Sequence, residues 1–405
     1  MAEEKVVQSG TGQSFSDFMD AAKRLRPLIE KHADEAEQLR HQADPVVSAL
    51  RESGIYTMLL PKDLGGAELS FVEALEVVEQ VSIADGSTGW CSMVSNVAGS
   101  TVGAYLPEKG AQQVWKDGPN RTLAGQGVPR GHARRVDGGF MIEGAWSYGS
   151  GIYHAEVIHS GCTVMKDGKP ELDENGLPEI ILAHFDPDEI DLGDNWDVMG
   201  LRGTGSYDYK LKQAELFVPD YMCYRYAADV PVRGGNQYSP GLIGFTTWGH
   251  TAWAMGIGRR LLDEITAIAS SKANVFGKIG EGAAFKYDFA KSESKYRSAR
   301  AFCHDVWDDI SESLIRGEPA SLEQVALIRM AMRHMHDVIS EISTFTHRSG
   351  GGVSLRPSII QRCFRDIHAG TQHILLSDQI YQESARVLLG MTGEDARWSI
   401  FGVLD

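Results

Sequence analysis

Asp366 and His373 are the two residues of this sequence whose types and spacing most directly fit acid–base chemistry. The periodicity predicts a helix over 358–389, and on a helix two residues seven positions apart share a face. Ala369 and Gly370 fall on the same face, where small side chains leave room for a flat ring. A carboxylate beside a histidine can orient the imidazole, which can then hold or accept a proton near neutral pH. The alternative to a catalytic His373 is a histidine that is buried in the core and serves only as a hydrogen-bond partner.

A second set of candidate side chains lies in a predicted β segment and among scattered tryptophans. The segment 144–151 contains Trp146 and Ser150, an indole and a hydroxyl group. Trp90 and Trp248 could line an aromatic pocket, although scattered tryptophans more often fill a core. Two alternatives stay open here: Trp146 as a plain β-core aromatic and Ser150 as a hairpin turn residue.

Metal-binding and dinucleotide-binding patterns are missing from the sequence. Gly200, Gly203 and Gly205 lead into alternating β residues and lack the strand-then-helix context of a dinucleotide fingerprint. His334 and His336 stand two apart on a predicted helix, so they point to different faces. We therefore expect no metal site, and we expect any NAD(P)H chemistry to take place on another protein.

The composition is that of an ordinary globular protein, with 405 residues and a formal net charge of -16. This acidic surplus argues against nucleic acid or an anionic membrane as the partner. No apolar run approaches the roughly 20 residues that cross a bilayer, and the N-terminus lacks the apolar core of a signal peptide. The five cysteines are scattered and form no Cys-x-x-Cys pair, as in a reduced protein. We therefore expect a cytoplasmic enzyme.

The elements that must position these residues change in kind along the chain. Residues 1–14 read as a polar tail, 15–120 show helical periodicity, and 121–235 hold short apolar runs and alternations between turn signals. Residues 236–405 are helical again. Long amphipathic segments there cover 245–270, 285–315, 321–347 and 358–389. Helices, then a β unit, then helices predict an α+β fold that is mostly α, and they argue against a doubly wound sheet.

Motifs placed along the whole chain resemble the acyl-CoA dehydrogenase superfamily. They are Pro61-Lys-Asp-Leu-Gly-Gly66, Ala84-Asp-Gly-Ser-Thr-Gly-Trp90, Gly200-Leu-Arg-Gly-Thr-Gly-Ser206, Phe217-Val-Pro219, and Gly350-Gly-Gly352 before Arg365-Asp366. The resemblance implies an N-terminal helical domain, a central β-barrel domain and a C-terminal four-helix bundle, assembled as a homotetramer. The chemistry stays open, because the superfamily contains both flavin dehydrogenases and flavin monooxygenases.

A dehydrogenase of this superfamily needs a carboxylate that removes a proton from the acyl-CoA. In most members a glutamate follows the Arg-Asp pair, and the same distance from Arg365 lands on Ile374. Other members place it on an early helix of the bundle, but 230–262 contains no Asp or Glu. Glu383 is a possible substitute for this base, but it falls more than two helical turns after the position of the usual glutamate. An acyl-CoA dehydrogenase with bound FAD is therefore the alternative function.

The segment that ends at His373 instead resembles the signature of the two-component flavin monooxygenases (group D), whose second histidine faces the substrate. The run from Trp146 to Ser150 and Gly151 resembles their Trp-x-x-x-Ser-Gly element, in which the serine bonds flavin N5 and favours the C4a-hydroperoxide. The resemblance implies reduced flavin (FMNH2 or FADH2) from a separate NAD(P)H-flavin reductase, with O2 as co-substrate. The implied substrate is a small aromatic, phenolic or indolic, such as indole-3-acetate; N- or S-oxygenation is a second alternative.

The resemblance also distributes roles among these residues. His373, Ser150 and Asp366 would be catalytic, with Asp366 orienting the histidine or a neighbouring loop. The residues expected to bind flavin are Trp146, Ser150, Gly151, Arg202, Thr204, Gly351 and Gly352. The residues expected to bind substrate are Trp90, His373 and Trp248. Many dehydrogenases contact FAD through an Arg-x-Gln-Phe-Gly element, and the different sequence at 273–277 favours a loosely held flavin.

Overall fold

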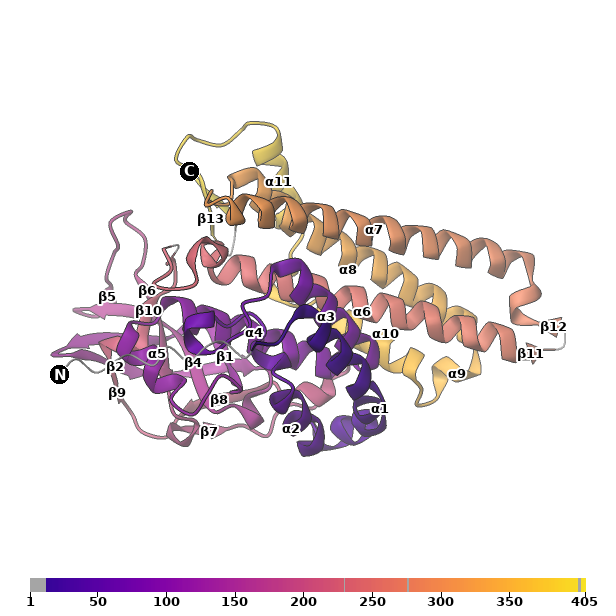
Figure 1. Ribbon diagram of the computed structural model, residues 1–405, viewed down its shortest axis with the longest axis horizontal. Helices are drawn as coiled ribbons and strands as arrows, with labels where there is room; N and C mark the ends of the chain where they lie inside the picture. Colours follow the sequence, from indigo (N-terminus) through magenta and orange to yellow (C-terminus); the bar gives the residue numbers. More distant parts are fainter. Residues whose placement is uncertain (1–11, 229, 275–276, 400–401) are drawn as a thin grey trace.

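The computed structural model describes residues 12–228, 230–274, 277–399 and 402–405. Residues 1–11 of the predicted tail and the middle of the 273–277 segment lie outside these ranges. Helices from the N-terminal part, two β-sheets from the middle and long C-terminal helices pack against one another (Figure 1). This mostly helical α+β arrangement confirms the predicted fold class. Within the described ranges, no helix is long and apolar enough to cross a membrane.

The N-terminal part is a cluster of helices that surrounds one buried helix. The helices are α1 (Phe15–Leu39), α2 (Asp44–Glu52), α3 (Phe71–Ala84), α4 (Gly86–Tyr105) and α5 (Glu108–Val114). Ser14 and Ser70 begin α1 and α3 with capping boxes, and Asp85 caps α4. Nearly all of α4 is buried, which agrees with its many Gly, Ser and Ala residues. It carries Trp90 into the centre of the molecule.

The β region consists of two sheets that enclose Trp146. The larger has the order β10-β6-β4-β1-β2-β9, with β5 beside β4, and the smaller has the order β3-β8-β7. The strands are β1 (Leu123–Val136), β2 (Gly139–Glu143), β3 (Ala145–Gly149), β4 (Val157–Lys166), β5 (Lys169–Pro170), β6 (Ile180–Phe185), β7 (Ile190–Leu192), β8 (Tyr207–Leu211), β9 (Leu216–Pro219) and β10 (Cys223–Arg225). The register of β1 against β4 shifts between Gln126 and Gly131. Such an irregularity bends a strand locally, and here it lies where β1 approaches the helices.

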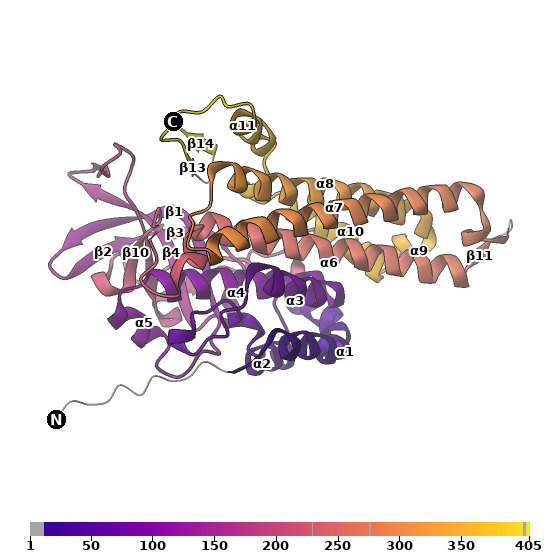
Figure 2. The same ribbon diagram turned by 45° about the horizontal axis from the view of Figure 1, so that its top comes forward.

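The C-terminal part is built from long helices that pack side by side. They are α6 (Gly241–Ser271), α7 (Ala283–Ile315), α8 (Leu322–Gly350), the single turn α9 (Gly352–Leu355), α10 (Ile359–Gly370) and α11 (Gln379–Leu388). In Figure 2, α6 lies between the N-terminal helices and the rest of this part, and it contacts α3, α4 and α8. Two small hairpins, β11 (Ala273–Asn274) with β12 (Gly277–Lys278) and β13 (Arg397–Ser399) with β14 (Gly402–Leu404), complete the chain. The predicted segments 245–270, 285–315 and 321–347 are confirmed as α6, α7 and α8.

The prediction of one continuous helix over 358–389 is wrong. α10 ends at Gly370, and the chain then turns into the short 3-10 helix Ile374–Leu376 before α11 begins. Gly370 packs directly on Trp253, since a Cβ atom there would lie 2.4 Å from the indole ring. Its small size therefore makes room for a core tryptophan. The helical face expected to hold both Asp366 and His373 does not exist, and the turn carries His373 elsewhere.

Candidate active site

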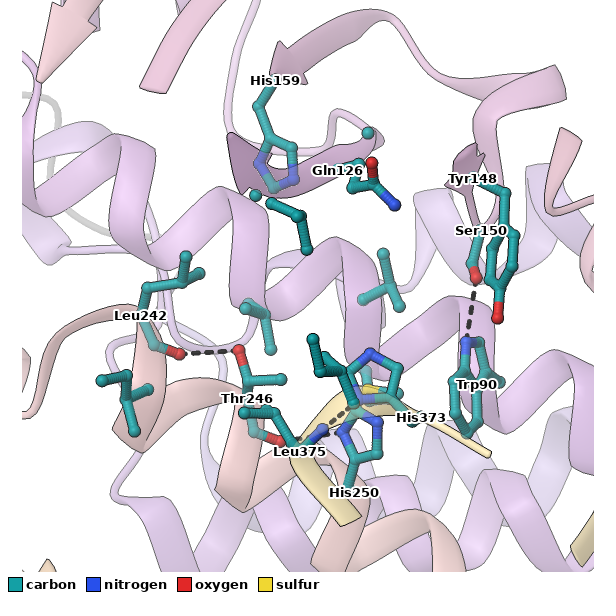
Figure 3. A pocket seen from close by; sticks show the side chains of 18 of the residues that line it. Trp90, Gln126, Tyr148, Ser150, His159, Leu242, Thr246, His250, His373 and Leu375 are labelled. Atoms are coloured by element: carbon teal, nitrogen blue, oxygen red, sulfur yellow. Dashed lines mark hydrogen bonds between the residues drawn. The ribbon is translucent and has the colours of Figure 1, made fainter. Parts of the chain in front are cut away.

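A cavity of about 300 Å³ lies where the three parts of the molecule meet. Its walls come from α4, from β1, from the end of β3, from the start of α6 and from the segment that follows α10. Figure 3 shows Gln126 and His159 on one side, His250 and His373 on the opposite side, and Ser150 with Trp90 at one end. Among the described residues that line it, Arg130 carries the one permanent charge and none is an Asp or Glu.

Ser150 faces this cavity as a hydrogen-bond acceptor. Thr204 donates its hydroxyl to the carbonyl oxygen of Leu201 (2.8 Å), so the hydroxyl of Ser206 donates to Thr204 (2.6 Å). The hydroxyl of Ser150 must then donate to Ser206 (2.7 Å), while Trp90 Nε1–H donates to Ser150 Oγ (3.0 Å). Each hydroxyl has one proton and two lone pairs. One lone pair of the buried Ser150 oxygen is therefore left for a ligand that donates an N–H.

His373 faces the cavity, and its surroundings fix which ring nitrogen carries the proton. Its Nδ1 accepts the backbone N–H of Leu375 at 3.3 Å, and a backbone N–H can only donate. Burial lowers the pKa of His373 to about 4, because it penalises the charged imidazolium. The ring is therefore neutral near pH 7, with its proton on Nε2. His373 thus offers the cavity an N–H donor.

His250, which the sequence reasoning did not single out, lies beside His373. The two ring centroids are 4.2 Å apart. His250 Nδ1 lies 3.0 Å from the carbonyl oxygen of Thr246, which can only accept, so this nitrogen carries the proton. Burial, then the neighbouring His373 and His336, hold the pKa of His250 well below its usual range. Its Nε2 is a bare acceptor, buried and without a hydrogen-bond partner among the described residues.

Of the predicted aromatic residues, Trp90 lines the cavity and two others do not. Trp90 meets Trp253 edge to face with centroids 4.9 Å apart, which fixes its indole against the wall. Trp248 is completely buried and donates its indole N–H to the carbonyl of Phe71. Trp146 is also completely buried, where it donates to a β-strand carbonyl and stacks on a tyrosine of β8. Both are core residues that do not line the cavity.

Asp366 lies outside the cavity and holds a loop. It is fully buried, and its Oδ1 accepts the backbone N–H of Leu201 at 2.6 Å. Desolvation, followed by repulsion from Asp85, raises the pKa of Asp366 to about 7. This carboxylate was expected to orient either His373 or a neighbouring loop. The geometry supports the second role, because the bond to Leu201 holds the loop that precedes Arg202. The guanidinium of Arg202 bonds the carbonyl of Val198 at 2.9 Å.

The other predicted flavin ligands lie at different distances from the cavity. Thr204 reaches it only through the hydroxyl chain to Ser150. Gly151 lies beside Ser150 and lines a much smaller neighbouring space. Gly351 and Gly352 stand at the α8–α9 junction, at the end of the helices far from the sheets (Figure 1). They do not line the cavity, and their role in flavin binding stays a prediction.

The residues present fit a flat, polar-edged ring such as flavin. Gly125 and Gly127 form part of the wall, and a Cβ atom on Gly127 would lie 3.0 Å from Leu242, so the strand offers a smooth cradle. Gln126 Oε1 is buried and has no hydrogen-bond partner among the described residues. The Ser150 oxygen gives the cavity an acceptor for a ring N–H group. Buried polar atoms without a partner are uncommon and point to a ligand or ordered water.

Two family models match the chain. The acyl-CoA dehydrogenase N-terminal domain matches residues 13–113, and the acyl-CoA dehydrogenase C-terminal domain matches residues 248–378. Together the two matches span more than half of the chain. The chain therefore belongs to the acyl-CoA dehydrogenase family, within its branch of flavin-dependent monooxygenase oxygenase subunits.

Relatives match over almost the full length. Indole-3-acetate monooxygenase of Pseudomonas putida is 29% identical, covering 94% of both chains. The flavin-dependent monooxygenase oxygenase subunit HsaA of Rhodococcus jostii is 28% identical, covering 86% of this chain and 92% of its own. The structure of 3-HSA hydroxylase from Rhodococcus sp. RHA1 superposes with a TM-score of 0.85 at 24% identity, covering 94% and 98%. XiaF from Streptomyces sp., in complex with FADH2, superposes with a TM-score of 0.83 at 18% identity, covering 94% and 97%.

Proposed function

We propose that this chain is the oxygenase component of a two-component flavin monooxygenase and that it hydroxylates a small phenolic or indolic substrate. The observation that carries the proposal is the cavity itself, which combines Ser150 with two neutral histidines, His250 and His373, and has no carboxylate among its described lining residues. Reduced flavin, when bound, supplies the electrons that activate O2 and transfers one oxygen atom to the ring. FMNH2 and FADH2 both suit the proposal.

The hydroxyl chain that ends at Ser150 suits a reduced rather than an oxidised flavin. A reduced flavin carries a ring N–H at N5, and the Ser150 oxygen has a lone pair to accept it. The indole N–H of Trp90 and the hydroxyl of Ser206 hold that oxygen in place. Retaining the N5 proton suppresses the loss of activated oxygen as hydrogen peroxide, which is the role we assign to Ser150.

The apolar part of the cavity would keep water from the reacting atoms. Met93, Val94 and Val97 extend one wall from α4, and Leu242 and Leu375 extend the opposite side. A dry site strengthens each hydrogen bond made to the substrate and limits side reactions with water. His373 Nε2–H would then hold the oxygen of a phenol, which fixes the ring carbon that receives oxygen.

The alternative of an acyl-CoA dehydrogenase lacks its base. Asp366 is taken up by the Leu201 amide outside the cavity. Glu383 forms an ion pair with Arg386 at 2.8 Å on α11 and accepts the backbone N–H of Val403. Neither carboxylate lines the cavity. N- or S-oxygenation would use the same flavin and oxygen, so only the substrate panel separates it from ring hydroxylation.

The test supplies the purified chain with NADH, a generic flavin reductase, FMN or FAD, and O2. A panel of phenols, indoles including indole-3-acetate, an aromatic amine and a sulfur heterocycle is analysed by mass spectrometry. We expect a product heavier by one oxygen atom from a phenol or an indole, labelled when 18O2 is used. Bleaching of a bound flavin by an acyl-CoA without O2, and no oxygenated product, would instead establish the dehydrogenase.

Partners follow from the same proposal. An NAD(P)H-flavin reductase must deliver the reduced flavin, since the glycine motifs of this chain lack the dinucleotide fingerprint. We also propose a homotetramer, in which Gly351, Gly352 and Arg202 could meet flavin bound largely by another subunit. Light scattering and flavin titration of Gly351→Ala test that arrangement: weaker flavin binding without loss of the tetramer is expected.

A further inference from the structure

Strand β1 carries a wide bulge where it borders the cavity. Its register against β4 shifts so that residues 127–130 stand opposite Gly161 alone. Gly161 admits the bulge because it has no side chain: a Cβ atom there would lie 2.2 Å from the carbonyl oxygen of Gly127. Bulges next to active sites commonly re-aim a side chain. This bulge ends on Arg130, which it places in the cavity wall.

The residues on either side of Arg130 fix the position of its backbone. Pro129 has a locked φ angle and restricts Val128 to extended conformations. Gly131 returns the chain to the core, since a Cβ atom there would lie 2.6 Å from the indole ring of Trp146. Arg130 itself is exposed although it lines the cavity. It therefore lies at the mouth, where the cavity meets solvent.

The guanidinium of Arg130 has no anionic partner within the described parts of the chain. It makes no ion pair or hydrogen bond there, whereas Arg134 and Arg135, further along the same strand, both pair with glutamates. A formal net charge of -16 means that carboxylates are in excess in this chain, yet none of those described neutralises this cation. The described lining of the cavity contains no Asp or Glu either. A bound ligand is left to supply the anion.

An acidic substrate would complete this arrangement. A guanidinium binds a carboxylate through two parallel, charge-assisted hydrogen bonds. The interior is a poor place for the charge, because Met93, Val97 and Leu242 line it with apolar groups and burying an unpaired carboxylate is costly. We propose that Arg130 binds the acidic group of the substrate, which is an aromatic acid whose ring enters the cavity. This inference rests on the proposed function and narrows its substrate class to phenols or indoles that bear a carboxylate.

Binding of the acid at the mouth would orient the ring inside. Gln126, where the bulge begins, faces His373 across the cavity (Figure 3). The guanidinium of Arg130 would hold one end of the substrate, and the Nε2–H of His373 would hold a polar atom at the other end. Two points of attachment leave the ring one orientation, which fixes the carbon that receives oxygen.

The test compares compounds that share a ring and differ in charge. One series is indole-3-acetate, indole-3-acetamide and tryptamine, and the other is 4-hydroxyphenylacetate, its amide and tyramine. Calorimetry on the purified, flavin-free full chain gives the ratio of affinities within each series, so a preference for one ring cancels. We compare the wild type with Arg130→Glu, which reverses the charge. Arg24→Glu is the matched control, because Arg24 is an exposed arginine on α1 that makes no ion pair within the described ranges and lies outside the cavity.

In at least one series, the wild type and Arg24→Glu should bind the acid about fivefold more tightly than the amide, as expected for a partly exposed ion pair. Arg130→Glu should lose this preference and bind the amine about fivefold more tightly than the amide, because the introduced carboxylate attracts the ammonium group. Thermal unfolding checks that each variant is folded. Three results overturn the inference: no preference for the acid on the wild type in both series, an unchanged preference in folded Arg130→Glu, or an equal loss in Arg24→Glu.

The phosphate of FMN is the other anion that could pair with Arg130, and a second set of titrations separates the two sources. The wild type is titrated in the presence of FMN and, in parallel, of riboflavin, which lacks the phosphate. A preference for the acid that persists with both flavins supports the inference. A preference lost with either flavin overturns it, and a loss with FMN alone assigns the guanidinium to the flavin phosphate.

Failure of this inference differs from failure of the proposed function. If the acids bind no better than their amides while the reductase-coupled assay oxygenates neutral phenols or indoles, the oxygenase assignment stands and the role of Arg130 falls. If the acids bind as expected but nothing is oxygenated and an acyl-CoA bleaches a bound flavin, the proposed function falls, and with it the aromatic acid as a substrate.

Discussion

Replacing Asp366 by Asn should separate a structural carboxylate from a catalytic one. The side chain is fully buried, its Oδ1 accepts the Leu201 amide, and its Oδ2 has no hydrogen-bond partner among the described residues. Asn keeps the acceptor for Leu201 and removes the ionisable group. Because the carboxylate lies outside the cavity, Asp366→Asn should keep oxygenation with the same product.

The effect on stability depends on pH, and its sign follows from the pKa of Asp366, which burial and Asp85 raise from 3.8 to about 7. The folded protein keeps the proton up to about pH 7, whereas the unfolded chain releases it near pH 4. The stability contributed by this group is therefore fully present below about pH 4 and is lost as the pH rises to about 7. About three pH units, at roughly 1.4 kcal/mol for each, correspond to on the order of 4 kcal/mol, of which roughly 3 kcal/mol falls between pH 5 and pH 8.

The assay is urea unfolding of the wild type and Asp366→Asn at several pH values between about 5 and 8. We expect the free energy of unfolding of the variant to rise relative to the wild type by roughly 3 kcal/mol across this range. Titratable groups that do not interact with Asp366 are common to both proteins and cancel in the difference. Parallel stability profiles would mean that Asp366 is ionised in the folded protein, and loss of oxygenation in a stable variant would return it to the catalytic residues.

Three further predictions concern the cavity itself. Ser150→Ala removes the acceptor for a flavin N–H, so a larger share of the consumed O2 should leave as hydrogen peroxide. Ser206→Ala, which only redirects the Ser150 hydroxyl, should have a smaller effect. An oxygen electrode with a peroxide assay measures both variants, and an unchanged share of peroxide in Ser150→Ala would contradict the role assigned to Ser150. His373→Ala should lower the rate of product formation by about 10²-fold or more while peroxide release persists; full product yield would remove His373 from the site. Arg130→Gln should weaken the binding of a carboxylate-bearing substrate about fivefold and leave the binding of its uncharged analogue unaffected. Calorimetry measures both affinities. Equal losses of affinity for the two compounds would mean that Arg130 acts through the flavin or the fold.

The order of elements and most helix lengths could be predicted from the sequence because they depend on local periodicity. Amphipathic repeats predicted α6, α7 and α8, and turn signals with apolar alternation predicted the β region. The break after Gly370 was missed because its cause is tertiary. Gly370 stands against the indole of Trp253 from another helix, and no local pattern records that contact.

The family resemblance was a better guide to the site than helical spacing. Ser150 and His373, named from the resemblance, and Trp90, named as a possible pocket aromatic, do line one cavity. Trp146 and Trp248 were not distinguishable from Trp90 in the sequence, because all three are tryptophans in apolar surroundings. Which of them lines a cavity depends on whether another chain segment fills the space beside the ring.

His250 shows why the remaining part of the site required a structure. Residues 230–262 contain no carboxylate that could act as a base, and the one histidine in that stretch carries no local signal that would mark it as part of a site. Even with both histidines in view, the sequence could not say which one offers an N–H to the cavity. That depends on a backbone N–H at Leu375 and a backbone carbonyl at Thr246, groups that every residue of the chain carries. Only the turn after α10 brings that particular N–H to His373, and so the same turn that disproves the predicted helix places the proton of His373 on Nε2.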